Sequence, residues 1–398
     1  MTAVALTGAR IFDGERLLDD HAVVVEGGGI RALMRTSRLE PVLPQRRLAG
    51  LLAPGFIDVQ VNGGGGVLLN DEPTREGIRR IGAAHRRFGT TGFMATLISD
   101  TRARTREAMA AVAEGLAAGV PGLLGIHVEG PFLNSERRGV HDAAMIRPLE
   151  PEDFAILTSL KQGRTLVTLA PEKVAPETIA RLVEAGVIVA AGHTAADYGT
   201  VRRALAAGLT GFTHLFNAMP PLASREPGPV GAALEDRASW CGLIVDLHHV
   251  AAPSCRVAVA AKGSDRVMLV TDAMSSVGTE MAEFCFQGRR ILRAGGRLTT
   301  EDGVLAGSDL DMASAVRNTV DALGLPLEQA LAMASRVPAA FLRLDGELGR
   351  IAPGYRASLV LLDADLQVRE TWIDGVASAE ESAQPAAAYQ QRRRGDEA

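Results

Sequence analysis

Three side chains of this sequence, Glu129, His193 and His214, have the types and the positions needed to hold a metal ion. Each stands at the polar end of an apolar, β-branched run: LLGIHVEGP, VIVAAGHT and GFTHLFNAM. Two imidazoles and one carboxylate, with a fourth position left for water, are what a catalytic zinc requires. The alternative is a buried carboxylate that is hydrogen-bonded to neutral imidazoles. Because the three occupy equivalent positions in separate runs, we favour one divalent cation, zinc or a metal of similar preference.

A fourth candidate, Asp272, ends the apolar run LVTDAM. A carboxylate after such a run is costly unless a charged or donating group meets it, and a water activated by the metal is such a partner. The alternative is an N-cap for a following helix, since Asp is a good cap and Ser275 and Ser276 are close by. We predict that Asp272 is a general acid and base.

Between residues 54 and 343 the sequence repeats a pattern of strand and then helix. Strands buried on both faces are near-continuous apolar runs, and eight of them with helices between are typical of a closed parallel (β/α)8 barrel of the TIM type. In such barrels the active site lies at the C-terminal ends of the strands, where the four candidates above are expected. The eight predicted strands are residues 55–62, 90–99, 123–130, 165–171, 187–194, 209–217, 241–249 and 267–274.

Both ends of the chain contain short β-type runs that are separated by turn residues. Neither the stretch 1–53 nor the stretch 344–379 looks able to bury a face alone, so we predict that they pair into one small β-sandwich domain. Residues 380–398 mix charge, Gln and Ala without an apolar period, which predicts a mobile tail.

Composition and charge restrict the classes of partner. The formal net charge of −5 provides no basic face, which disfavours nucleic acid. No run of about 18 apolar residues occurs and the first residues do not form a secretion signal, so we expect no membrane contact and a cytoplasmic location. The three cysteines are widely spaced without a CxxC pair, which argues against disulfides and thiolate metal sites, and we expect buried thiols: Cys241, Cys255 and Cys285.

Longer motifs add a resemblance to a known family. They are APGFIDVQVNGGGG (53–66), GIHVEGPFLNSERRGVHD (125–142), AAGHT (190–194), THLFNAMPPLASREPGPVG (213–231), GLIVDLHHV (242–250), LVTDAM (269–274) and LGRIAPGYRASLVLLD (348–363). With them the chain resembles the amidohydrolase superfamily and, within it, the N-acetylglucosamine-6-phosphate deacetylases. The resemblance runs from about residue 4 to residue 375.

One departure from the wider superfamily concerns the number of metal ions. Most amidohydrolases carry His-x-His on the first barrel strand, whereas this chain has Gln60 and Asn62, and neutral amides are poor metal ligands. The resemblance therefore implies one metal per subunit, held by Glu129, His193 and His214. Gln60 and Asn62 are interpreted as support for these ligands or for a water.

The resemblance also implies roles for residues that the pattern alone leaves open. Asp272 would take a proton from water and return it to the departing sugar nitrogen, while His141 would polarise the acetamide carbonyl. Arg225 and His249 would bind the phosphate, with His248 as the alternative to His249. Asn217, Ala218, Leu305, Ala306 and Gly307 match positions that line the sugar and acetyl pocket.

The implied activity is hydrolysis of N-acetylglucosamine 6-phosphate to glucosamine 6-phosphate and acetate. The substrate is then a small amino-sugar phosphate, and the resemblance also implies a homodimer in which the neighbouring subunit helps to close the phosphate pocket. One alternative keeps the chemistry and changes the sugar, for example to N-acetylgalactosamine 6-phosphate. Another is a silent barrel that senses a sugar phosphate, but such a protein is expected to lose a metal ligand or the aspartate, and this chain retains all four.

Overall fold

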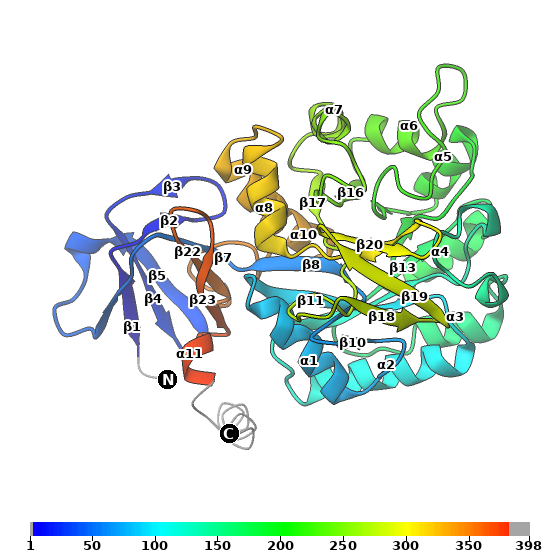
Figure 1. Ribbon diagram of the computed structural model, residues 1–398. Coiled ribbons are helices and arrows are strands. Elements are labelled where there is room, and N and C mark those ends of the chain that lie inside the picture. Colours follow the sequence, from blue (N-terminus) through cyan, green and yellow to red (C-terminus); the bar gives the residue numbers. More distant parts are fainter. Residues whose placement is uncertain (1–2, 382–398) are drawn as a thin grey trace.

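The computed structural model of the protein describes residues 3–381. It has a small β-rich part, built from both ends of the chain, and a larger α/β part between them (Figure 1). From residue 382 onward, the tail that we predicted for residues 380–398 lies outside the described residues.

Within residues 3–381, eight parallel strands form one sheet in chain order, and this sheet curves almost into a closed barrel. The first and last strands approach each other, because the Asp272 amide donates to the Gln60 carbonyl at 3.0 Å and Val61 bridges to Ala273. The predicted (β/α)8 TIM-like barrel is therefore confirmed. Its strands are β8 (Phe56–Val61), β11 (Thr90–Ile98), β12 (Leu123–Glu129), β13 (Arg164–Leu169), β14 (Ile188–Ala191), β15 (Gly211–Phe212), β16 (Trp240–Leu243) and β17 (Val267–Leu269).

Helices cover the outside of this barrel. In α1 (Arg75–Arg86), the side chain of Thr74 caps the N-terminus by accepting a hydrogen bond from the Gly77 amide at 3.0 Å. The apolar face of the same helix, with Ile78 and Ile81, packs among the side chains of the barrel. No helix in the described part of the chain has the length and apolar character to cross a bilayer. The other barrel helices are α2 (Arg102–Ala117), α3 (Pro151–Leu157), α4 (Pro176–Glu184), α5 (Tyr198–Ala206), α6 (Gly228–Glu235), α7 (Ala252–Lys262), α8 (Met312–Asp321), α9 (Leu327–Ala334) and α10 (Arg336–Phe341).

The small part is a β-sandwich that joins the two ends of the chain. One sheet has the order β5-β4-β1-β6 and the other β24-β23-β22-β7-β2-β3, so the late strand β22 lies beside the early strand β7 (Figure 1). Leu6 and Val23 of the first sheet pack against Leu359 and Trp372 of the second. The predicted sandwich is confirmed, while the domain limits after residues 53 and 343 stay predictions. Its elements are β1 (Val4–Thr7), β2 (Arg10–Phe12), β3 (Leu17–Leu18), β4 (His21–Glu26), β5 (Gly29–Arg35), β6 (Gln45–Arg47), β7 (Leu51–Pro54), β22 (Leu359–Leu362), β23 (Val368–Ile373), β24 (Val376–Ala377) and α11 (Ser378–Glu381).

An antiparallel sheet, β18-β19-β20-β21, is inserted between the last barrel strand and α8 (Figure 1). Its Phe284 and Phe286 pack against Ile98, which ends β11, and Met274, so the insertion lies near the C-terminal ends of the barrel strands. The alternating pattern of β18 leaves Cys285 exposed, and the expectation of three buried thiols is wrong for this residue. The remaining strands are β9 (Gly63–Gly64), β10 (Val67–Leu68), β18 (Glu283–Phe286), β19 (Arg289–Ala294), β20 (Arg297–Thr300) and β21 (Leu305–Ser308).

Candidate metal centre

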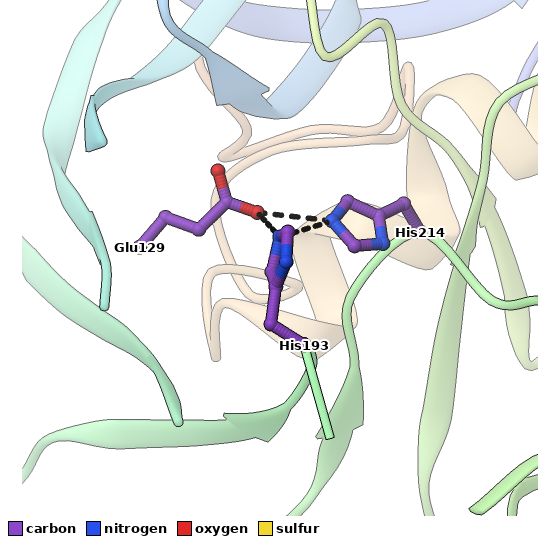
Figure 2. Close-up of side chains that lie close together, drawn as sticks. All are labelled: Glu129, His193 and His214. Atoms are coloured by element: carbon purple, nitrogen blue, oxygen red, sulfur yellow. Dashed lines mark hydrogen bonds and ion pairs between the residues drawn. The ribbon is translucent and has the colours of Figure 1, made fainter. Parts of the chain in front are cut away.

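The three predicted metal ligands converge at the C-terminal end of the barrel (Figure 2). The Nε2 atoms of His193 and His214 lie 3.4 and 3.1 Å from Oε1 of Glu129, and the two nitrogens are 3.0 Å apart. All three side chains are buried, and their ligand atoms lie within 4.8 Å of one another. The structure therefore brings the Glu129–His193–His214 cluster together from three separate strand ends.

Backbone turns at the strand ends direct these side chains inward. Glu129 is the last residue of β12, whereas His193 and His214 follow β14 and β15 with φ values of +48° and +30°. Asp272 follows β17 in the same left-handed region, with φ +54°. Residues other than glycine rarely occupy this region and store about 1–3 kcal/mol each, so strain is concentrated where the chemistry is expected.

The orientation of the two imidazoles fits a cation. Nδ1 of His193 lies 2.8 Å from the Arg137 carbonyl and must donate to it, which leaves the lone pair of Nε2 facing Glu129 and His214. Nδ1 of His214 is buried without a hydrogen-bond partner among the described residues, and its Nε2 faces Oε1 of Glu129 and Nε2 of His193. Two imidazole nitrogens and a carboxylate oxygen that converge in this way are a donor set for a divalent cation of the zinc type.

The electrostatics of Glu129 agree with this arrangement. Burial alone would raise the pKa of its carboxyl group, but in the metal-free site the hydrogen bonds and the charges of protonated His193 and His214 hold that pKa well below its usual range. Glu129 therefore stays ionised, which is the state that binds a metal.

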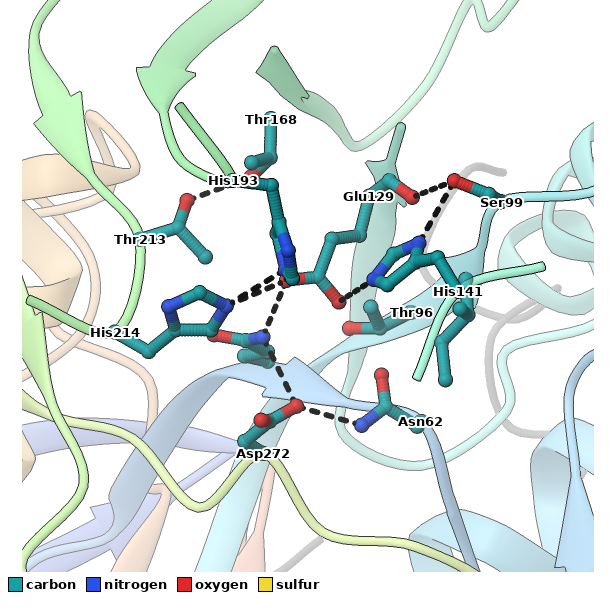
Figure 3. Close-up of polar contacts among 12 residues, drawn as sticks. Asn62, Thr96, Ser99, Glu129, His141, Thr168, His193, Thr213, His214 and Asp272 are labelled. Carbon is teal, nitrogen blue, oxygen red and sulfur yellow. Dashed lines mark hydrogen bonds and ion pairs between the residues drawn. The ribbon is translucent and has the colours of Figure 1, made fainter. Parts of the chain in front are cut away.

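Asp272 lies beside the cluster and is held by two side-chain amides, from Gln60 in β8 and from Asn62 directly after β8 (Figure 3). Its Oδ1 accepts from Nε2 of Gln60 at 2.9 Å and from Nδ2 of Asn62 at 2.7 Å, and Gln60 also donates to Oε1 of Glu129 at 2.9 Å. The alternative role as a helix cap is wrong, because Asp272 caps no described helix. Burial and the nearby charge of Glu129 raise the pKa of Asp272 to about 6.

His141 also reaches the cluster, although it comes from a long loop. Its Nδ1 lies 2.7 Å from Oγ of Ser99, and its Nε2 lies 4.0 Å from Oε2 of Glu129 (Figure 3). The ring meets that of His193 edge to face, with 4.4 Å between centroids. Burial, together with the neighbouring His193, holds the pKa of His141 well below its usual range, so its imidazole is neutral.

The five residues predicted to line the sugar pocket lie in two segments next to this centre. Nδ2 of Asn217 donates to the His214 carbonyl at 3.3 Å, and the Ala218 carbonyl accepts from the Thr194 amide at 3.2 Å. Gly307 has φ +59°, and a Cβ there would come within 3.0 Å of the Asp272 carbonyl oxygen. Strand β21 therefore lies directly against Asp272, and with Gly307 it contains the other two of these residues, Leu305 and Ala306.

The predicted phosphate-binding residues differ in how the structure places them. Nδ1 of His249 donates to Oδ2 of Asp246 at 2.6 Å, whereas Nδ1 of His248 accepts from Nε of Arg297 at 3.0 Å. Both histidines follow β16 near the cluster end of the barrel. Arg225 lies exposed in the loop before α6 and makes no hydrogen bond or ion pair with any residue that the structure describes.

Comparison with known proteins identifies the family. Residues 51–384 match the amidohydrolase family, and residues 4–52 match the NagA composite domain. The chain belongs to the amidohydrolase family. As an amidohydrolase it is a metal-dependent enzyme, and the Glu129–His193–His214 cluster is its candidate metal site.

Individual relatives of this amidohydrolase cover almost its whole length. An N-acetylgalactosamine-6-phosphate deacetylase of Shewanella sp. (strain ANA-3) is 45% identical, with 92% of this chain and 94% of that protein covered. An N-acetylglucosamine-6-phosphate deacetylase of Haemophilus influenzae is 33% identical, with 93% and 98% covered. The crystal structure of N-acetylglucosamine-6-phosphate deacetylase from Pasteurella multocida superposes with a TM-score of 0.92 at 32% identity, covering 94% of this chain and 99% of that one.

Sequence reasoning missed several residues that support the amidohydrolase site. Glu172 accepts hydrogen bonds from Asn134, Thr194 and the Ala195 amide, and so fixes the turn after His193. Glu172 ends the run TLVTLAPE, and a charged residue directly after a buried strand was the available signal. Asp246 and Ser99 follow apolar runs in the same way, and each contacts a histidine that sequence reasoning did select.

Proposed function

We propose that this amidohydrolase removes the acetyl group from N-acetylglucosamine 6-phosphate, giving glucosamine 6-phosphate and acetate. The proposal is based mainly on one observation: the side-chain amide of Gln60 donates hydrogen bonds to both Glu129 and Asp272. One side chain therefore holds a second buried carboxylate next to the carboxylate of the predicted metal ligand. Amide hydrolysis needs a polarising centre, which a metal held by Glu129 would supply, and a group that moves a proton, which is the role that we propose for Asp272.

We propose zinc as the metal, one ion per subunit, bound by Glu129, His193 and His214. A nitrogen-rich set with one carboxylate suits zinc, although iron, cobalt and manganese accept the same donors. A divalent cation held by these three residues would lower the pKa of a bound water and would polarise a carbonyl oxygen. Gln60 and Asn62 already donate to carboxylates, which supports one metal rather than two.

Asp272 moves the proton in this proposal. Two amides occupy its Oδ1, while its Oδ2 makes no hydrogen bond among the described residues and is the atom available to a water. Asp272 takes a proton from the attacking water and delivers it to the sugar nitrogen as the C–N bond breaks, because an amine leaves only when protonated. The raised pKa of about 6 suits both steps near neutral pH.

The remaining predicted residues bind the substrate. His141 donates to the acetamide carbonyl oxygen through Nε2 and stabilises the oxyanion that develops there. Asn217, Ala218 and strand β21, with Leu305, Ala306 and Gly307, form the sugar and acetyl pocket. His249 binds the phosphate with Arg225. The family resemblance suggests that a second copy of the chain closes the pocket in a homodimer, and we propose a cytoplasmic location for it.

The second candidate substrate is N-acetylgalactosamine 6-phosphate. It is favoured by the relative from Shewanella, which carries that name and is more similar to this chain, at 45% identity, than the relative from Haemophilus influenzae. The two sugars differ only at C4. We keep N-acetylglucosamine 6-phosphate as the first assignment and N-acetylgalactosamine 6-phosphate as the alternative.

The test is acetate release by the purified, zinc-loaded protein, measured as kcat/KM with each sugar. A higher kcat/KM for N-acetylglucosamine 6-phosphate supports the first assignment, and a reversed preference supports the second. Absence of turnover with both sugars, at full metal content, would overturn the proposed function and favour a sugar-phosphate sensor.

A further inference from the structure

The imidazole of His141 has a hydrogen-bond partner on the side that faces away from the metal ligands. Ser99 directly follows β11, is 1% exposed, and places its Oγ 2.7 Å from Nδ1 of His141 and 3.4 Å from the Glu129 carbonyl oxygen (Figure 3). The hydroxyl has room because residue 130 is glycine: a Cβ at Gly130 would lie only 2.2 Å from Oγ of Ser99. The contact is therefore built into the packing of two loops.

The hydroxyl of Ser99 has one proton and two acceptors within reach. Donation to Nδ1 of His141 at 2.7 Å puts the ring proton on Nε2, whereas donation to the Glu129 carbonyl at 3.4 Å would make Nδ1 the donor to Oγ. The first arrangement is favoured, because 3.4 Å is near the limit for a hydrogen bond and an N–H on Nε2 faces the carboxylate of Glu129 at 4.0 Å. Nδ1 of His141 is then an acceptor, so the single proton of the neutral ring lies on Nε2. If the ring proton lay on Nδ1 instead, Nε2 would carry only a lone pair and could not donate a hydrogen bond.

The position of Nε2 makes this assignment matter. Nε2 lies on the cluster side of the ring, 4.0 Å from Oε2 of Glu129, where an N–H is aimed at the space beside the ligand atoms. Only the tautomer with a proton on Nε2 offers a donor to a carbonyl oxygen at that place.

A residue of the inserted sheet holds Ser99 and the His141 loop together. Nε2 of Gln287 donates to the Ser99 carbonyl at 3.0 Å, and Oε1 of Gln287 accepts from the Asp142 amide at 3.2 Å. Asp142 directly follows His141, so one amide group fixes the separation of the serine and the histidine. Gln287 lies in the turn between β18 and β19, which is anchored by the buried Phe284 and Phe286.

We propose that Ser99 is a positioning residue that keeps the ring proton of His141 on Nε2, and that Gln287 holds the two residues in the geometry required. The inference rests on the proposed function, because it directs that N–H to the acetamide carbonyl oxygen of the substrate. It also assigns a role to the inserted sheet: through Gln287, the insertion orients a group of the active site.

The first test is kinetic and uses the zinc-loaded full chain. Ser99→Ala is expected to lower kcat by roughly 10- to 100-fold, the range for losing a partner that orients a catalytic side chain, with KM and metal content nearly unchanged. Gln287→Leu is expected to lower kcat less. The matched control is Ser335→Ala, which also removes a buried hydroxyl, bonded to the Leu331 carbonyl at 2.7 Å, and should leave kcat unchanged. An unchanged kcat in Ser99→Ala would overturn the proposal.

The second test reads the tautomer directly by ¹⁵N NMR of histidine-labelled, zinc-loaded protein, with His141→Asn to assign the signals. The expected result is a proton on Nε2 of His141 in the parent protein and a reduced population of that form in Ser99→Ala. A proton on Nδ1 in the parent, or an unchanged tautomer in Ser99→Ala, would overturn the proposal. Because this measurement needs no turnover, it decides the role of Ser99 even if acetate release from both sugars fails and the proposed function falls.

Discussion

Asp272→Asn separates the chemistry of the site from its stability. The asparagine keeps an Oδ1 that accepts from the amides of Gln60 and Asn62, so both present hydrogen bonds are retained. It loses the capacity to accept and return a proton. Turnover is therefore expected to fall by roughly 10²- to 10⁴-fold, the range for a positioned acid or base. Metal content should not change, because Asp272 is not one of the three cluster ligands.

The same substitution is expected to stabilise the metal-free protein at high pH. Folding raises the pKa of Asp272 from 3.8 to about 6, and about two pKa units correspond to roughly 3 kcal/mol. Because the pKa of Asp272 is raised in the folded state, its contribution to the free energy of unfolding is fully present below pH 4 and is lost as the pH rises through about 6. Asparagine does not ionise, so the variant should gain up to about 3 kcal/mol over the parent at pH 8 and nothing at pH 4.

The assay is urea unfolding of both metal-free proteins at pH 4 and pH 8, combined with acetate release and elemental analysis of the loaded forms. A variant that is less stable than the parent at pH 8 would refute the electrostatic reasoning. Activity within a few fold of the parent would refute the role of Asp272 as acid and base.

Four further perturbations test other parts of the structure. Chelation should abolish acetate release and added zinc should restore it, whereas turnover that survives complete metal removal would exclude the cluster as the catalytic centre. Burial raises the pKa of Asp58 to about 7, so the stability of Asp58→Asn relative to the parent should rise between pH 4 and 7 in urea unfolding, and a constant difference would contradict this cause. Glu172→Ala should weaken metal affinity roughly 10- to 100-fold in competition with a chelator, because it frees the turn after His193, and unchanged affinity would show that the turn needs no such support. Leu247 has φ +66°, a conformation that is strained for leucine but not for glycine, so Leu247→Gly should raise the free energy of unfolding by up to about 1 kcal/mol. A loss of stability would mean that the contacts of the leucine side chain stabilise the fold by more than the backbone strain costs.

The barrel was predictable because its strands are buried on both faces and therefore appear in the sequence as apolar runs. The predicted strand 209–217 shows the limit of that reasoning, since β15 contains only Gly211 and Phe212. The chain leaves the sheet early because His214 adopts a left-handed conformation and turns its ring toward the cluster. An apolar run marks the burial of a segment, but it does not mark the residue at which the backbone turns.

The site residues that could be predicted from the sequence are those that stand at the ends of apolar runs. Glu129, His193, His214 and Asp272 all do, and a barrel brings such ends to one axis. The contacts that orient them were not predictable, because they join loops that are distant in sequence: Ser99 and His141 are 42 residues apart, and Gln287 and Ser99 are 188 apart. Which loops meet depends on the conformation of the insertion and of the long loop after β12, and a local sequence pattern does not specify which distant loop each one contacts.

Main-chain hydrogen bonds from neighbouring segments hold the left-handed residues at the strand ends in place. The carbonyl of His193 accepts from the Asn134 amide of the loop after β12, and the residue after His214, Leu215, donates to the Gly242 carbonyl of β16. The carbonyl of Asp272 accepts from the Ser308 amide of β21. Each left-handed residue is thus held, directly or through its neighbour, by a main-chain bond to a different segment. Because each of these residues is held by a different segment, a substitution that loosens one loop should displace one ligand without unfolding the barrel. Loop substitutions should therefore lower the metal affinity before they lower the free energy of global unfolding.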